Sequence, residues 1–276
     1  MRKINIVKVI GICLVVFYVT VALIPVYWLV TTSFKPRTEV YTFPVKYIPS
    51  YLTWEMAHNS LTQRPTVSFL RNSLIAAVGS TILALAVGVP AAYALAREKF
   101  PGRKDIAFYI LTTRMFPPVT ASIPIYFIVK SLRLLDSLAG LIPVYAVFNL
   151  AIIIWVMKGY IQQIPEEIEE SARVDGCNRF GAFMRITLPL ISPGMAAVSI
   201  ITLVLSWNEF FFALLLTHSP AAKTLPVGIA EFIGGAYGIL WGEICFLGTV
   251  AIIPMIVLIL LVQKYIVRGL TMGAIR

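Results

Sequence analysis

Charged side chains are scarce in this sequence of 276 residues. Asp, Glu, Lys and Arg together make up 13% of it, about half of their share in an average soluble domain. Hydrophobic residues make up 59%, and the mean hydropathy is +0.86. This balance excludes an ordinary soluble domain and predicts an integral membrane protein that crosses the bilayer several times.

The side chains that most enzymes use for catalysis or metal binding are also few. The only histidines, His58 and His218, fall in predicted loops, which excludes a histidine-based metal site. No Gly-Lys pair occurs, so this chain cannot hydrolyse ATP with a P-loop. The three cysteines, Cys13, Cys177 and Cys245, imply no disulfide or metal framework. We therefore expect no metal, no cofactor and no catalytic site here.

Long apolar runs predict an all-α integral membrane fold with six transmembrane helices. The runs cover about residues 7–30, 72–96, 106–129, 138–157, 194–217 and 244–262. Each is long enough, as a helix, to cross the hydrocarbon core of a bilayer. The first run is too long for the core of a signal peptide and no small-residue cleavage site follows it, so we interpret it as a retained span. The semi-polar segment 227–237 is expected to be a re-entrant or surface helix.

Lysine and arginine are divided unevenly between the two sides of this six-span layout. Eight lie on the side opposite the termini, and five of these belong to one long loop, whereas Arg114 lies within a span. Fourteen lie on the side that holds both termini: Arg2, Lys3, Lys8, Arg97, Lys99, Arg103, Lys104, Lys158, Arg173, Arg179, Arg185, Lys264, Arg268 and Arg276. Because cytoplasmic loops are rich in Lys and Arg, both termini and the loop 158–193 are expected in the cytoplasm. The charges form no patch, so we expect no nucleic-acid partner.

One charged stretch, residues 164–176, interrupts the apolar chain. Pro165 suits the first position of a helix, and four glutamates follow where the helix dipole favours negative charge. Gly176 suits the end of this helix, and Asn178 suits the cap of a second helix that Pro189 is expected to end. The pattern predicts two short helices with an elbow at Gly176. Neither can span a bilayer or persist alone in water, so they need a partner to dock on.

The spacing in this stretch resembles the EAA loop of ABC importer permeases. Glu170-Ser171-Ala172 matches the Glu-Ala-Ala of that motif, with Ser171 as a small-for-small departure, and Gly176 and Ile186-Thr187-Leu188-Pro189 follow at the motif's distances. The resemblance implies that these residues couple the chain to a cytoplasmic ATPase: Ile168, Glu170, Ser171, Ala172, Asp175, Gly176, Leu188 and Pro189. Glu170 and Asp175 would make polar contacts there, and Ile168 and Ala172 apolar ones. The alternative is an amphipathic hairpin on the membrane surface, which should be basic rather than acidic.

Two polar groups fall inside predicted spans. Arg114 precedes Pro117 and Pro118, which should break the helix, and Asn208-Glu209 lies in the middle of the fifth span. A charge in the membrane should face protein or water, so Arg114, Pro117, Asn208 and Glu209 are candidates for a translocation pathway. The alternative is structural: Arg114 and Glu209 form an ion pair that holds helices together, or Arg114 lies nearer the interface.

Further segments resemble the carbohydrate uptake (MalG-like) family of these permeases. They are residues 114–118, 123–126, 134–141 and 207–210, and the tail 267–274, where Gly269 and Gly273 would let the backbone approach the ATPase. The resemblance implies one permease domain over residues 1–276, in the cytoplasmic (inner) membrane of a prokaryote. It also implies a second homologous permease subunit, two ATPase subunits that bind ATP and Mg²⁺, an extracellular or periplasmic solute-binding protein, and a sugar or polyol as substrate. A frayed, solvated end is the alternative for the tail.

Two other classes of membrane protein compete with this interpretation. A self-sufficient secondary transporter should show paired internal repeats and intramembrane acids for ion coupling, and the sequence has no repeat of useful length. An integral-membrane enzyme would need the catalytic cluster that is missing. Co-purification separates these classes, because only the permease depends on an ATPase partner.

Overall fold

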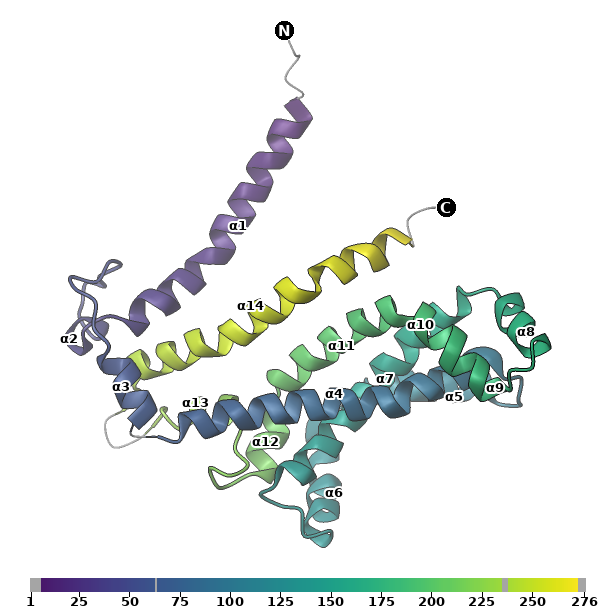
Figure 1. The fold of residues 1–276 in the computed structure, drawn as a ribbon. Helices are drawn as coiled ribbons and strands as arrows, with labels where there is room; N and C mark the ends of the chain where they lie inside the picture. The colour runs from purple at the N-terminus through teal and green to yellow at the C-terminus, as the bar shows by residue number, and fades with distance from the viewer. Residues whose placement is uncertain (1–5, 63, 235–237, 273–276) are drawn as a thin grey trace. The chain divides into compact units, whose positions relative to one another are not determined.

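The computed structural model describes residues 6–62, 64–234 and 238–272, and all of its regular elements are helices (Figure 1). They are α1 (Ile6–Ser33), α2 (Arg37–Val40), α3 (Glu55–Thr62), α4 (Thr66–Arg97), α5 (Arg103–Thr113), α6 (Pro118–Ser131), α7 (Leu138–Gln162), α8 (Glu166–Val174), α9 (Arg179–Ala182), the π-helical turn η1 (Phe183–Thr187), α10 (Leu188–Leu190), α11 (Ser192–Trp207), α12 (Phe211–Leu216), α13 (Leu225–Ala230) and α14 (Trp241–Met272). The chain divides into two compact units. Unit 1 comprises Met1–Val67 and Gly228–Pro254, and unit 2 comprises Ser68–Val227 and Met255–Arg276.

Four helices of the described residues are long and apolar enough to cross a membrane. They are Lys8–Ser33, Thr66–Arg97, Leu138–Gln162 and Trp241–Leu260. A fifth candidate is a pair of helical segments, Arg179–Leu190 and Ser192–Trp207, that meet at an angle of 73°. The sequence predicts six spans, and the differences arise in the ranges 106–129 and 194–217.

The range 106–129 contains two helices instead of one. α5 has 11 residues and α6 has 14, so neither meets the length of a span alone. Pro117 is extended (ψ 128°) and Pro118 begins α6. A residue before proline avoids the helical region, and proline at the first helical position loses no hydrogen bond, so the pair both ends one helix and starts the next. The predicted break at Pro117-Pro118 is confirmed.

The range 194–217 is interrupted at residues 208–210, between α11 and α12. Both carboxylate oxygens of Glu209 accept backbone hydrogen bonds at the start of α12, from the N–H of Phe212 (2.8 Å) and of Ala213 (3.1 Å). Asn208 donates its side-chain amide back to the carbonyl of Val204 (2.8 Å). The polar residues therefore satisfy the backbone groups that the break exposes.

Unit 2 has its core between α4, α7 and α11. Gly194 in α11 touches the ring of Tyr160 in α7 so closely that a Cβ would lie 2.7 Å from the ring. A buried polar chain joins the same helices: the hydroxyl of Ser206 accepts from the amide of Asn149 (2.8 Å) and contacts the hydroxyl of Ser80 (3.0 Å). Close backbone approach and shared side-chain hydrogen bonds are the usual means of joining helices in a membrane.

Unit 1 has a smaller core, which is formed by Met56, Phe232, Phe246 and Leu247. The hydroxyl of Ser33 at the end of α1 lies 2.9 Å from that of Thr249 in α14. Over its most apolar stretch, by contrast, α1 has no buried residue. An apolar surface of this size needs lipid or protein to cover it.

Candidate functional site

The helix α8 and the elbow at Gly176 form as the sequence predicts. Gly176 has φ +92°, the Gly176 N–H donates to Arg173 (3.1 Å), and the Cys177 N–H donates to Ala172 (3.0 Å). These two bonds form the Schellman motif that ends a helix at a glycine. The side chain of Asn178 then accepts from the N–H of Gly181 (2.7 Å) and caps α9. Both local predictions are confirmed.

The exposed apolar side chains of this region differ from the predicted set. Ile168 is 43% exposed, but Ala172, expected beside it as an apolar contact, is only 9% exposed. Ala172 therefore faces the chain itself. Val174 (87% exposed) and Phe180 (70% exposed) supply apolar surface instead. Glu170, Ser171 and Asp175 are also exposed.

The segment after the elbow continues past the residue that was expected to end it. Leu188 donates its N–H to the carbonyl of Phe183, a five-residue step that makes η1 a π-helical turn. Pro189 therefore falls in the first turn of α10, where a missing N–H is tolerated. The helical segment ends at Leu190, and the prediction that Pro189 ends it is wrong. Leu188 is partly buried and packs against the core of unit 2, whereas Pro189 is exposed.

The last turn of α4 holds α8 in place. The Nε of Arg97 donates to Glu169 (2.8 Å), and its Nη2 donates to the carbonyl of Ile164 (2.8 Å). The hydroxyl of Tyr93 donates to the second oxygen of Glu169 (2.8 Å). We call Tyr93, Arg97 and Glu169 the α4–α8 joint. Sequence analysis missed it, since it treated Arg97 only as a positive charge in a loop.

A second contact connects the end of α4 to α9. Arg179 donates from Nη1 to both carboxylate oxygens of Glu98 (2.5 Å each). The side chains are more exposed than those of the α4–α8 joint, 64% for Arg179 and 39% for Glu98. Arg97, in the last turn of α4, thus contacts α8 before the Gly176 elbow. Glu98, the next residue, contacts α9 after it. Figure 1 shows α8 and α9 beside one another in this unit.

A cavity of about 220 Å³ lies in unit 2, beside the two helix breaks. Its wall includes Arg114, Asn149 and Glu209 as polar groups. The rings of Phe148 and Phe212, whose centroids lie 4.7 Å apart, provide apolar surface. Sequence analysis missed Asn149, although a lone amide in an apolar run is itself a signal for a functional position.

Only two of the four predicted pathway residues line this cavity. Arg114 and Glu209 both line it, whereas Pro117 and Asn208 do not. Arg114 donates to the carbonyl of Phe148 (3.1 Å), and Glu209 caps α12. The described ion pairs do not join Arg114 to Glu209, so the predicted structural pair between them is wrong. Backbone groups, rather than the opposite charge, satisfy both side chains.

The predicted tail contacts lie at the end of the described chain. Gly269 belongs to α14. Gly273 lies outside the described residues. The expectation that both approach an ATPase stays a prediction.

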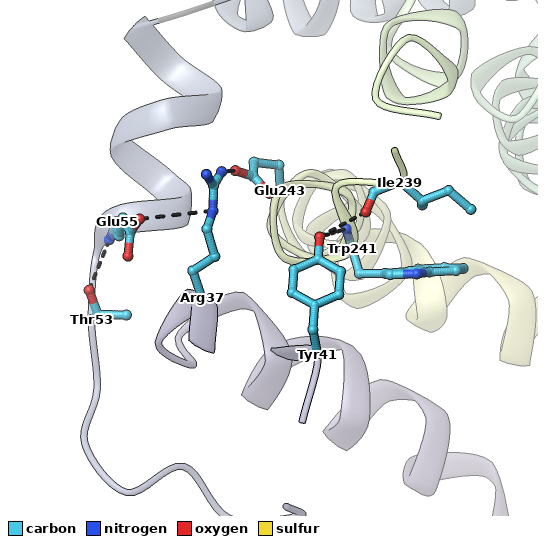
Figure 2. Close-up of polar contacts among 7 residues, drawn as sticks. All are labelled: Arg37, Tyr41, Thr53, Glu55, Ile239, Trp241 and Glu243. Atoms are coloured by element: carbon cyan, nitrogen blue, oxygen red, sulfur yellow. Dashed lines mark hydrogen bonds and ion pairs between the residues drawn. The ribbon is translucent and has the colours of Figure 1, made fainter. Parts of the chain in front are cut away.

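A polar cluster joins the loop after α1 to the start of α14 within unit 1 (Figure 2). The guanidinium of Arg37 contacts Glu243, which is 3% exposed, and lies 4.0 Å from Glu55. The hydroxyl of Tyr41 donates to the carbonyl of Ile239 (2.7 Å) and accepts from the Trp241 N–H (3.3 Å). We call the contact of Arg37 with Glu243 the α2–α14 joint.

Two carboxylates, Glu39 in α2 and Asp136 in the loop between α6 and α7, have lowered pKa values. Hydrogen bonds from the Lys46 ammonium and from Ser50 lower the pKa of Glu39 to about 2. Burial raises the pKa of Asp136, but hydrogen bonds from Ser219 and the N–H of His218 outweigh it, so the net pKa is lowered. Both groups are ionised at neutral pH and stabilise loops.

The acidic and sulfur-bearing side chains do not gather into a metal site in the part of the chain that the structure describes. No group of three or more His, Cys, Asp or Glu residues there could hold a metal ion. The arrangement offers an exposed apolar and acidic surface around the Gly176 elbow and a lined cavity.

A family model for the inner membrane component of binding-protein-dependent transport systems matches residues 84–272. This range includes the Gly176 elbow, η1 and all the residues that line the cavity. The chain belongs to this family. It is therefore a membrane protein.

Relatives of this transport component match nearly the whole chain. It is 35% identical to the sulfoquinovosyl glycerol transport system permease protein SmoH of Agrobacterium fabrum, over 92% of this chain and 89% of that protein. It is 35% identical to the trehalose transport system permease protein SugB of Mycobacterium tuberculosis, over 92% and 93%. It is 32% identical to the trehalose/maltose transport system permease protein MalG of Thermococcus litoralis, over 93% and 92%.

The fold also has a counterpart among solved structures. A chain of a bacterial ABC transporter that imports the acidic polysaccharide alginate superposes with a TM-score of 0.80. The match covers 96% of this chain and 98% of that chain, at 24% identity. The fold is that of an ABC importer permease.

Proposed function

We propose that this protein is the permease subunit of an ATP-driven importer for a sugar or polyol, and forms half of its translocation pathway. The observation that carries the proposal is the exposed α8 with its elbow at Gly176, in a chain that belongs to a binding-protein-dependent transport family. Relatives named as trehalose, maltose and sulfoquinovosyl glycerol permeases support the substrate class.

In this proposal, α8 and α9 dock on a cytoplasmic ATPase subunit. An isolated helix of nine residues is not stable in water, and Ile168, Val174 and Phe180 expose apolar surface around the elbow. Glu170 and Asp175 are exposed beside them and free to make polar contacts. ATP binds to that partner together with Mg²⁺, and hydrolysis of ATP there supplies the energy of transport. The permease itself is then not an enzyme.

The cavity of about 220 Å³ is proposed as part of the sugar pathway. Aromatic faces stack on the apolar faces of sugar rings, and a few placed polar groups bind their hydroxyls. Phe148 and Phe212 offer the first kind of surface, and Arg114, Asn149 and Glu209 the second. Residues from two interrupted helices meet here, and irregular backbone at membrane depth is tolerated where it lines a cavity.

We propose six membrane crossings with both termini in the cytoplasm. The broken range 106–129, with α5 and α6, and the interrupted range 194–217, with α11 and α12, would each count as one crossing. The complete importer would also contain a second permease, a second ATPase subunit and an extracellular or periplasmic solute-binding protein. The distribution of Lys and Arg supports this orientation.

The test is ATPase activity of the assembled complex in proteoliposomes, with and without the loaded solute-binding protein. Wild type is expected to show sugar-stimulated ATPase activity. The double variant Glu170→Lys with Gly176→Pro should lose the stimulation while the protein stays in the membrane, because it reverses a charge on the docking surface and destroys the Schellman turn.

The matched control is Asp105→Lys, which reverses an exposed acid in the first turn of α5, outside α8 and α9. It should behave like wild type. Undiminished stimulation in the Glu170→Lys, Gly176→Pro variant would refute the docking role of α8. Accumulation of sugar without an ATPase partner would instead favour a secondary transporter.

A further inference from the structure

We propose that the end of α4 positions the docking elbow, with Tyr93, Arg97 and Glu98 as positioning residues for coupling between ATPase and permease. This inference rests on the proposed function, and it assigns the side chains that receive the movement of α8. Nothing in the EAA-like spacing specifies α4, since the motif lies entirely within residues 170–189.

The α4–α8 joint is largely buried. The side chains of Arg97 and Glu169 are each 8% exposed. Both carboxylate oxygens are occupied, one by Arg97 and one by the hydroxyl of Tyr93. A planar guanidinium that bonds a carboxylate and a carbonyl at once accepts one geometry. Displacement of α8 against α4 would break these bonds, and separating the partners of a largely buried ion pair is costly.

The charges of the joint also match the helix ends. Arg97 lies in the last turn of α4, where the dipole favours a cation, and Glu169 lies in the first turn of α8, where it favours an anion. Beyond the elbow the signs reverse, because Glu98 receives Arg179 from α9. The adjacent pair Arg97-Glu98 therefore presents a positive charge to α8 and a negative charge to α9. A shift that exchanged the partners would bring like charges together, so this register is favoured over its neighbours.

The elbow is held to α4 but exposed elsewhere. Its apolar side chains Ile168, Val174 and Phe180 are exposed, while its ionic contacts hold it to α4. A partner that moves the exposed surface would thus move α4. The competing route runs along the backbone from α9 through η1 and α10 into α11, and it needs none of these side chains. The two routes predict different results when the side chains are changed.

The experiment uses the more exposed pair, because Glu98→Arg and Arg179→Glu should leave the fold intact. The complex is assembled with its ATPase and solute-binding subunits, and the ratio of sugar-stimulated to basal ATPase activity is measured. Each single variant should lower this ratio by roughly 2- to 30-fold, the range for residues within a coupling network. The double variant restores opposite charges and should recover to within about twofold of wild type.

Two matched controls reverse exposed charges in the first turn of α5, at residues that form no described ion pair with α8 or α9. Asp105→Arg controls for Glu98→Arg, and Lys104→Glu controls for Arg179→Glu. Tyr93→Phe removes a single hydroxyl from Glu169 and should lower the ratio by a few-fold at most. Basal activity and co-purification of the ATPase subunits should be unchanged in Glu98→Arg and Tyr93→Phe, whose residues lie outside the docking helices, a result that a general loss of folding would not give.

Single variants that match their controls would overturn the inference and favour the backbone route. A double variant no better than the worse single variant would also overturn it, because the effect would then not come from the pair. In both cases a stimulated wild type would leave the proposed function standing. A wild-type complex without sugar stimulation would refute the proposed function and this inference together.

Discussion

The α4–α8 joint in unit 2 and the α2–α14 joint in unit 1 both place an arginine on a buried glutamate. They differ in how far water reaches the arginine: the Arg97 side chain is 8% exposed, and that of Arg37 is 46% exposed. The glutamates are similar, at 8% for Glu169 and 3% for Glu243. The comparison therefore separates the burial of the cation from that of the anion.

This difference in exposure decides whether an ion pair fixes the position of one helix against another. A half-exposed arginine can exchange its partner for water, so the α2–α14 joint tolerates movement. A buried arginine cannot, and removing it leaves the opposite charge uncompensated. The α4–α8 joint, which resists movement, holds the proposed docking helix. The α2–α14 joint, which tolerates movement, connects the short helix after α1 to the start of α14.

The largest expected effect comes from removing each arginine in turn. Arg97→Ala should lower the free energy of unfolding by about 3–5 kcal/mol, because Glu169 stays buried without its counter-charge. Arg37→Ala should cost about 1 kcal/mol, because water reaches the space that Arg37 leaves. Equilibrium unfolding of the full chain in mixed micelles measures both values. Lys104→Ala, at an exposed position, should change the value by less than about 0.5 kcal/mol. Equal losses at Arg97 and Arg37 would show that burial of the cation does not set the cost.

A smaller effect is expected where glycines allow close packing in each unit. Gly194→Ala should cost about 1–3 kcal/mol, because its Cβ would lie 2.7–2.9 Å from the stiff ring of Tyr160. Gly248→Ala should be close to neutral, because its Cβ would meet only the end of the flexible Leu29 side chain, at 3.0 Å. Gly159→Ala, with no atom within 4 Å, should stabilise its helix by up to about 1 kcal/mol. The same unfolding measurement applies, and a neutral Gly194→Ala would contradict the close packing of α7 on α11.

The smallest expected effect is a loss of stability at low pH, through one carboxylate in each unit. The pKa of Glu39 is lowered from 4.5 to about 2, so its contribution is complete above pH 4.5 and is lost as the pH falls from there toward 2. The pKa of Asp136 is lowered from 3.8, so its contribution is lost as the pH falls below that value. Thermal midpoints of wild type, Glu39→Gln and Asp136→Asn are measured from about pH 7 to pH 3. Each variant should lose less stability on acidification than wild type does. A midpoint that falls as steeply in Glu39→Gln as in wild type would exclude Glu39 as a source.

Local chemistry allowed much of the fold to be predicted. Gly176 and Asn178 act within a few residues of themselves, so turn and cap preferences identified the elbow. Pro117 and Pro118 identified a helix break in the same way. The all-helical class followed from the apolar runs, because a chain in lipid must satisfy its backbone internally.

Contacts between distant residues could not be predicted in this way. Arg97 and Glu169 are separated by 72 positions, and charge counting sees both only as loop charges. Burial of Ala172 depends on how α8 is held, which the helix pattern alone does not contain. For Glu209 a signal existed: it precedes Phe212 by three residues, the distance over which a side chain caps a helix start. Its position in an apolar run favoured an ion pair instead.

The backbone at Gly176 has one more consequence. No atom lies within 4 Å of the position that a Cβ would take there, so a side chain would have room. What excludes an ordinary residue is φ +92°, which L-amino acids rarely adopt. The restriction at the elbow is thus one of chirality and not of volume. A D-alanine introduced at position 176 by semisynthesis should preserve the turn that L-alanine strains.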